Sequence, residues 1–179
     1  MSTTHTPAGK APAQASPLWQ FSLKFYAIPG VAPACITLQD EAGVDVNLLF
    51  FLLWNATQGR ALNVNNVKDL DSIIGSWRNT AIIPLRELRR ALKSSPTILS
   101  PDAAEAFRTR IKQVELEAER LQQEAMYAMA QAGGSSATGL VPAEAARISV
   151  ASYQAILRAL PRGPLATVLA AFAKYAGNG

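Results

Sequence analysis

Side chains that commonly perform catalysis are scarce in this chain of 179 residues. It contains one histidine, His5, and one cysteine, Cys35, so neither a Ser/His/Asp triad nor a Cys/His pair is expected in a folded core. A zinc site made from the usual ligands is not expected for the same reason. No phosphate-binding glycine motif of the Walker or dinucleotide type occurs. We therefore predict no catalytic, cofactor-binding or metal-binding residues, and the composition favours a protein that is not an enzyme.

A candidate polar site consists of Gln39, Asp40, Asp45 and Asn47, which lie beside the start of the most apolar stretch of the chain. Carboxylate and amide oxygens next to an apolar wall are suited to bind a divalent cation or the polar end of a small ligand. The alternative is structural: Asp45 caps a helix, and Asn47 satisfies a backbone group in its first turn. The structural interpretation is favoured because helix caps are the commoner use of such residues.

A candidate partner-binding face consists of Arg86, Arg89, Arg90 and Lys93, within a segment, residues 78–112, that holds eight basic and three acidic side chains. Their spacing of i, i+3, i+4 and i+7 places them on one face of a helix. Such a face can bind an acidic protein, nucleic-acid phosphates or lipid head groups. Alternatively, it complements the helix dipole and pairs with glutamates of the following helix, and this structural role is favoured. Nucleic acid is not the favoured partner, because aromatic residues do not alternate with the basic ones.

Helices are expected to position these residues, because the apolar pattern has the helical period and no strand-like alternation occurs. The central helix is predicted over residues 45–58, where Leu48 to Trp54 carry no polar side chain and require burial on every side. We predict an all-α, single-domain bundle of six to seven helices around it. The other helices are predicted at residues 16–27, 31–40, 63–93, 101–132, 142–160 and 165–176.

The predicted helix over residues 63–93 contains Pro84, which cannot donate a backbone hydrogen bond and clashes with the preceding turn. This helix either kinks at the proline or breaks near Asn79–Thr80 and restarts. One kinked helix is favoured, because the apolar stripe keeps its phase across Pro84.

The predicted helix over residues 101–132 is the longest element, and its apolar residues recur at a spacing near 3.5 over more than three heptads. This stripe is either an exposed dimerisation seam or the face that packs against neighbouring helices of the same chain. Packing within the chain is favoured. The stripe consists of Phe107, Ile111, Val114, Ala118, Leu121, Ala125, Ala128 or Met129, and Ala132.

The helical domain is predicted to span residues 16–176, after a disordered tail at residues 1–15. A Gly- and Ser-rich linker at residues 133–141 precedes the last two helices. No apolar run approaches the ~20 residues needed to cross a bilayer. Cys35 lies on an apolar face and is expected to be a small core residue. A single cysteine and the lack of a signal-like N-terminus favour a cytoplasmic location.

Two groups of motifs resemble a known family. The first joins Leu38-Gln39-Asp40 to Gly43-x-Asp45-Val46-Asn47-Leu48-Leu49, and the second includes Trp77-Arg78 and Pro84-Leu85-Arg86. Together they resemble a family of small proteobacterial proteins of unknown function, over residues 17–125. The resemblance implies an all-helical, cytoplasmic bacterial protein, and it carries no activity, cofactor or catalytic residue.

A localised basic face without a catalytic constellation indicates a non-catalytic interaction or regulatory module. The expected partner is a protein, either an acidic one that binds Arg86 to Lys93 or a second copy that binds the helix at 101–132. The first alternative is a small-ligand binder or enzyme that uses Asp40, Asp45 and Asn47, and it predicts a concave pocket beside the central helix. The second alternative is nucleic-acid binding through the basic stripe.

Overall fold

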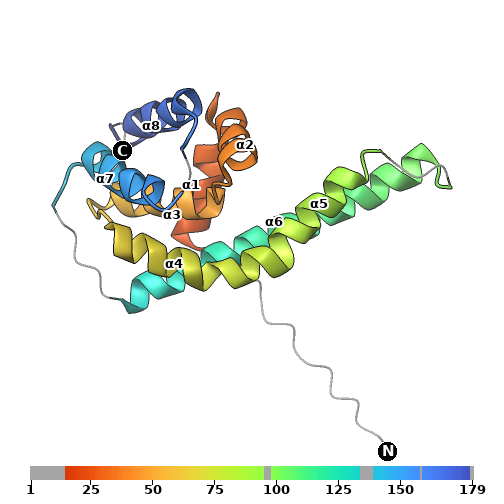
Figure 1. Ribbon diagram of the computed structural model, residues 1–179, viewed down its shortest axis with the longest axis horizontal. Helices are drawn as coiled ribbons and strands as arrows, with labels where there is room; N and C mark the ends of the chain where they lie inside the picture. Colours follow the sequence, from red (N-terminus) through yellow and green to blue (C-terminus); the bar gives the residue numbers. More distant parts are fainter. Residues whose placement is uncertain (1–14, 95–97, 134–138, 158, 178–179) are drawn as a thin grey trace, which may run out of the picture.

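A computed structural model describes residues 15–94, 98–133, 139–157 and 159–177, and these residues form helices joined by short turns (Figure 1). The predicted all-α class is confirmed for this part of the chain. When the continuous run α4–η1–α5 is counted once, the described residues form seven helices. The elements are α1 (Pro17–Tyr26), α2 (Val31–Ala42), α3 (Val46–Thr57), α4 (Val64–Trp77), η1 (Arg78–Ile82), α5 (Ile83–Ala91), α6 (Pro101–Ala132), α7 (Pro142–Gln154) and α8 (Arg162–Gly177).

Helix α3 is the central helix that the apolar run predicts. All of its residues from Asn47 to Ala56 are buried, because α1, α6 and α7 pack around it. Asp45 is its N-cap, and the carboxylate accepts hydrogen bonds from the backbone N–H groups of Asn47 and Leu48. A helix that is apolar on every side is stable in water only when it is enclosed in this way.

Aromatic side chains join α1 and α8 to the central helix. The Phe25 ring contacts those of Phe50 and Phe172 edge to face, and the Phe21 ring contacts that of Tyr175 in the same manner. Helix α2 packs against α8 on the outside of this cluster, and both appear at the upper side of Figure 1. Burial of large aromatic rings supplies much of the apolar area that stabilises a core of this size.

The segment that contains Pro84 is one continuous helix with a wider turn before the proline. Residues Arg78–Ile82 form a π-helical turn, in which the Ile83 N–H donates to the Arg78 carbonyl five residues earlier. The wider turn inserts one extra residue just ahead of Pro84, which has no N–H to offer the preceding turn. The helix therefore continues from Val64 to Ala91 without the break considered near Asn79–Thr80.

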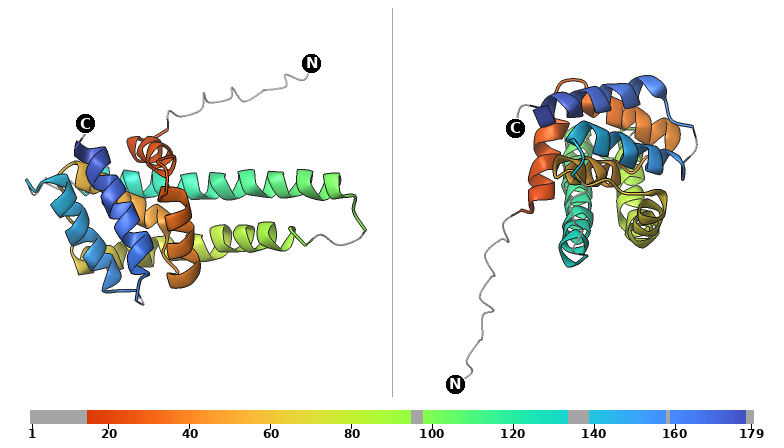
Figure 2. Two further views of the ribbon diagram at one scale, coloured as in Figure 1. Left: turned by 90° about the horizontal axis from the view of Figure 1, so that it is seen from above. Right: turned by 90° about the vertical axis from the view of Figure 1, so that its left-hand side faces the viewer.

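Helix α6 has 32 residues and is about 48 Å long at ~1.5 Å per residue. Its C-terminal half packs against α1 and α3, whereas its N-terminal half packs against α5. Helix α5 and the N-terminal half of α6 project from the other helices as an antiparallel pair, which we call the arm (Figures 1 and 2).

The structure corrects three details of the predicted pattern. First, Ala118 is the one residue of the predicted stripe that is buried, and the packed face of α6 otherwise contains Ala104, Glu115, Gln122, Gln123 and Met126, so it is offset from that stripe. Second, Phe107, Val114 and Leu121 of that stripe are exposed, because each lies on the flank of the packed face.

The third correction concerns the helix predicted over residues 142–160. Helix α7 ends at Gln154, and it buries Ser149 and Tyr153 while Ile148 is exposed. Residues 155–157 form a turn after α7, and the final helix begins at Arg162 instead of Leu165. The tail at 1–14 and the linker residues 134–138 lie outside the described residues.

By length and composition, no single helix within the described ranges could cross a membrane. Only α1 and α2 taken together meet these criteria, and that pair is bent by 101°.

Candidate functional site

Asp45 is the centre of a buried polar network at the start of α3. Its Oδ1 accepts from the backbone N–H groups of Asn47 at 2.9 Å and Leu48 at 3.2 Å. Its Oδ2 accepts from Arg78 Nη1 at 3.0 Å and from Gln122 Nε2 at 2.8 Å. Both oxygens of this carboxylate, which is only 3% exposed, are therefore occupied by donors of the protein. Asp45 thus joins α3 to η1 and α6, in addition to its role as a helix cap.

Arg78 is held between two carboxylates. Its Nη1 also donates to Asp71 Oδ1 at 2.7 Å. Burial by itself would lower the pKa of the Arg78 guanidinium. The carboxylates of Asp71 and Asp45 have the larger, opposite effect, and the net result is a raised pKa. The side chain leaves the helix at the first residue of the π-helical turn, a distortion that often marks a specialised position. Here it directs the guanidinium toward Asp45.

Asn47 belongs to a second branch of the network. Gln123 Nε2 donates to Asn47 Oδ1 at 2.8 Å, and Ser22 Oγ donates to Gln123 Oε1 at 2.7 Å. The Asp45 backbone N–H donates to the Tyr153 hydroxyl at 2.9 Å, and burial raises the pKa of that hydroxyl. These bonds connect α1, α3, α6 and α7 through buried groups, which are costly to leave without partners.

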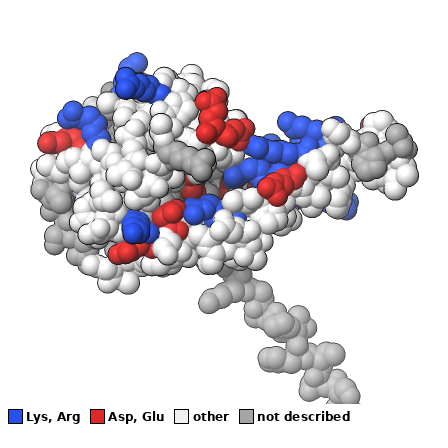
Figure 3. Space-filling model, viewed as in Figure 1, with Lys and Arg blue, Asp and Glu red and all other residues white. Residues whose placement is uncertain are grey.

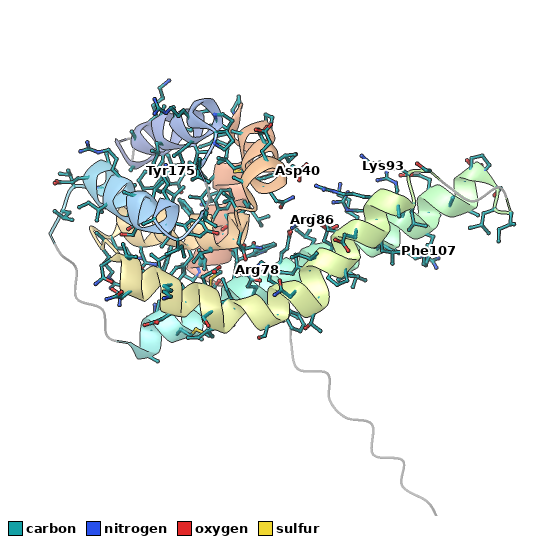
Figure 4. The ribbon with its side chains drawn as sticks, viewed as in Figure 1. Asp40, Arg78, Arg86, Lys93, Phe107 and Tyr175 are labelled. Carbon is teal, nitrogen blue, oxygen red and sulfur yellow. The ribbon has the colours of Figure 1, made fainter. Side chains whose placement is uncertain are left out.

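A pocket of about 240 Å³ lies between the start of α3 and the helix η1–α5. All four residues of the candidate polar site line it, together with three arginines that come from the opposite side. This volume is below the range of roughly 300–1,000 Å³ that is typical of ligand sites. Figure 4 shows Asp40, Arg78 and Arg86 around this region. The lining residues are Gln39, Asp40, Gly43, Val44, Asp45, Asn47, Arg78, Ile82, Ile83, Arg86, Glu87 and Arg90.

The arginines of the candidate partner-binding face are largely engaged in ion pairs within the molecule. Arg86 Nε donates to Glu115 Oε1 at 3.1 Å, and its Nη2 donates to Glu119 Oε1 at 2.9 Å. Arg89 forms a second ion pair with the Glu115 carboxylate. Burial raises the pKa of the Glu119 carboxyl, as does the neighbouring Glu115, against the opposing effect of Arg86. The arm is thus fastened along its base by ion pairs between α5 and α6.

Arg90 and Lys93 lie differently. Arg90 Nη2 donates to Asp40 Oδ1 at 2.6 Å, across the rim of the pocket, and this pair lowers the pKa of the Asp40 carboxyl. Both side chains of the pair are more than one-third exposed. Lys93 forms no ion pair with the described residues. Charged side chains gather on the edge of the arm that faces α2, as Figure 3 shows.

An apolar row on α6 consists of Phe107, Val114 and Leu121. The first two lie on the arm, and Leu121 follows in the C-terminal half of the helix. Their exposed fractions are 45%, 51% and 44%. Residues seven positions apart complete nearly two helical turns, so the three side chains lie on one face of α6. In Figure 4, Phe107 points away from the edge that carries Arg86 and Lys93.

Two inward-facing polar residues of α6, Gln122 and Gln123, were missed by reasoning from the sequence, and they supply the amides that reach Asp45 and Asn47. The pairing of the arginines with glutamates of the following helix, which the sequence suggests, is found at Glu115 and Glu119. One sequence signal was available: Glu115, Ala118 and Gln122 recur at three- and four-residue intervals, as the residues of a packed face do. The described residues contain no group of three or more His, Cys, Asp or Glu side chains arranged to hold a metal ion.

Comparison with known proteins shows one family. Residues 17–126 match the family described as "Protein of unknown function (DUF2390)", which covers α1 to α5 and most of α6. The chain belongs to this family, and the resemblance seen in its motifs is confirmed. No curated protein and no solved structure shows a significant match to the chain.

Proposed function

We propose that this protein is a non-catalytic interaction module that binds another protein through its arm. The observation that carries the proposal is the apolar row Phe107, Val114 and Leu121, which is half exposed on α6. Phe107 and Val114 lie on the half of α6 that projects as the arm, and Leu121 follows where α6 meets the other helices. Single exposed apolar residues are common on soluble proteins, but an aligned row on a projecting element is typical of a surface that a partner covers.

The base of the arm is braced against the rest of the molecule. Arg86 binds Glu115 and Glu119, and the Trp77 indole N–H donates to the Ala118 carbonyl at 3.0 Å. Side chains that are held in place before binding lose less conformational entropy when a partner arrives. A braced arm therefore suits recognition better than a freely moving helix pair would.

The proposed surface differs from the basic stripe that the sequence suggests. Arg86, Arg89 and Arg90 already have carboxylate partners, so an acidic protein or a nucleic acid would have to displace them. The apolar row has no such competitor among the described residues. We accordingly assign the interaction to the row and a mainly structural role to the stripe.

The proposal is tested by a photo-crosslinking amino acid placed at position 114 or 116 in the full chain, in cells that produce it. Leu116 is the matched control, because it is 48% exposed and lies two residues, or about 200°, around the same helix. We expect protein adducts from position 114 and few from position 116. Equal yields at both positions, or none at either, would contradict the proposal.

A second candidate function is the binding of a small anionic ligand in the pocket. The specific observation in its favour is that the predicted polar residues do line a cavity, with Arg78, Arg86 and Arg90 facing them. The exposed pair between Arg90 and Asp40 would open most easily, because exposed ion pairs contribute only about 0–1 kcal/mol. Titration with phosphate and with a dicarboxylate, followed by thermal unfolding, tests it: wild type but not Arg90→Gln should be stabilised.

A further inference from the structure

We infer that the partner of the apolar row is a second copy of this chain, bound antiparallel through α6 with the two-fold axis at Val114. This inference rests on the proposed function and names the occupant of the same surface. It is suggested by the symmetry of the row, since Phe107 and Leu121 lie seven residues on either side of Val114. A closed homodimer needs a surface of this self-complementary kind.

An antiparallel pairing about Val114 matches large side chains with large ones. Val114 meets Val114 of the second copy, while Phe107 meets Leu121 of the second copy at both ends of the contact. Every large residue of the row therefore gains an apolar neighbour. A parallel pairing would instead place the two Phe107 rings together and the two Leu121 side chains together.

The charges beside the row favour the same arrangement. Arg110 lies four residues before the centre and Glu117 three residues after it, and the helical period places both on one flank of the row. A two-fold axis perpendicular to the helices brings the same flank of both copies together and reverses their direction. The height of Arg110 along the helix then differs from that of Glu117 in the other copy by only one residue, or about 1.5 Å.

Both members of this expected pair are accessible. Arg110 is exposed and forms no ion pair within the described ranges. Glu117 is half exposed, and among the described residues its ion-pair partner is Arg120, one turn along the same helix. Such charges beside an apolar seam commonly set the direction in which two helices pair. A contact of three apolar layers is at the low end of interface sizes, so a dimer with a micromolar dissociation constant is expected.

The test is the mass of the full-length protein in solution, measured by sedimentation equilibrium between about 1 and 500 μM. We expect a rise from the 19.1 kDa of one chain toward twice that mass. Val114→Ser should weaken the dimer at least tenfold, whereas Leu116→Ser, an equally exposed position on the opposite face, should leave it unchanged. Circular dichroism establishes that both variants are folded.

Charge reversal tests the direction of pairing. Arg110→Glu and Glu117→Arg should each raise the dissociation constant about 3- to 10-fold, since each places like charges together at two symmetric sites. The double variant should restore wild-type affinity. A parallel dimer would show no such rescue, and that result would overturn the inference.

A mass that stays at 19.1 kDa over the whole range would also overturn it. The crosslinking result then separates two cases. Adducts of position 114 with a different protein would leave the proposed function standing without the second copy. The lack of any adduct would remove both.

Discussion

Replacement of Asp45 by asparagine is expected to destabilise the protein almost as much as replacement by alanine. Asparagine is ordinarily a good N-cap, so a site that needed only a cap would tolerate it. In this structure, however, Oδ1 accepts two backbone N–H groups, and Oδ2 accepts Arg78 and Gln122. An amide has one oxygen, so its NH₂ group must face one of these two sets of donors.

The size of the effect follows from the groups left without an acceptor. A hydrogen bond to a charged group contributes roughly 1.5–3 kcal/mol, and loss of one partner of a buried ion pair costs about 3–5 kcal/mol. Because Arg78 retains Asp71, we place both variants at the lower end of that second range, about 3 kcal/mol. A domain of ordinary stability, roughly 5–15 kcal/mol, remains folded after such a loss.

The assay is urea unfolding followed by circular dichroism for wild type, Asp45→Asn, Asp45→Ala and Asp71→Asn. Asp71 is the matched control, because it binds the same nitrogen of Arg78 but is 30% exposed. Its removal should cost less than about 1 kcal/mol. If Asp45→Asn loses no more stability than Asp71→Asn, then the bonds of Asp45 to Arg78 and Gln122 do not stabilise the fold.

Three further predictions concern other buried groups. Burial raises the pKa of the Glu119 carboxyl above its ordinary 4.5. Between these two pKa values the folded state keeps a proton that the unfolded chain has released. The free energy of unfolding should therefore fall as the pH rises from about 4.5 through the folded pKa. Glu119→Gln should remove that part of the pH dependence in urea titrations, and an unchanged profile would contradict it. Gly59→Ala should destabilise the protein by at least about 1 kcal/mol more than Gly43→Ala in thermal unfolding. Both glycines have positive φ, so the two substitutions share the backbone strain. A Cβ at Gly59 would also lie 2.8 Å from the Leu140 carbonyl oxygen, whereas one at Gly43 meets nothing within 4 Å. Burial raises the pKa of Cys35 to about 12, so its reaction with a thiol reagent at pH 8 should be slow until denaturant is added. Rapid reaction in buffer would show that the Cys35 side chain is not buried.

Several features of the fold could be predicted because their causes are local. The run Leu48 to Trp54 requires burial whatever surrounds it, and Ser16 and Ser100 each cap the helix that follows them, as short-range hydrogen bonding predicts. The uninterrupted helical period likewise predicts the all-α class. Such properties depend on neighbours within about one turn.

The candidate site could be predicted only in part. The sequence pointed to Asp45 and Asn47 as polar groups at the entry of the central helix. Their partners on α6, Gln122 and Gln123, are 77 and 76 residues away along the chain. The hydrogen bonds between them depend on how two helices cross, and a periodic pattern contains no information on that crossing.

The long helix shows the same division. Its heptad spacing by itself determined that Phe107, Val114 and Leu121 share one face of α6. Which face would meet α5 was decided by tertiary packing: Arg86 and Arg89 of α5 bind Glu115, and the position of Glu115 turns the neighbouring flank outward. Helix α6 carries apolar residues on more than one side, and only its contacts with neighbouring helices decide which side is covered. The apolar row that carries the proposed function is the side that this packing leaves uncovered.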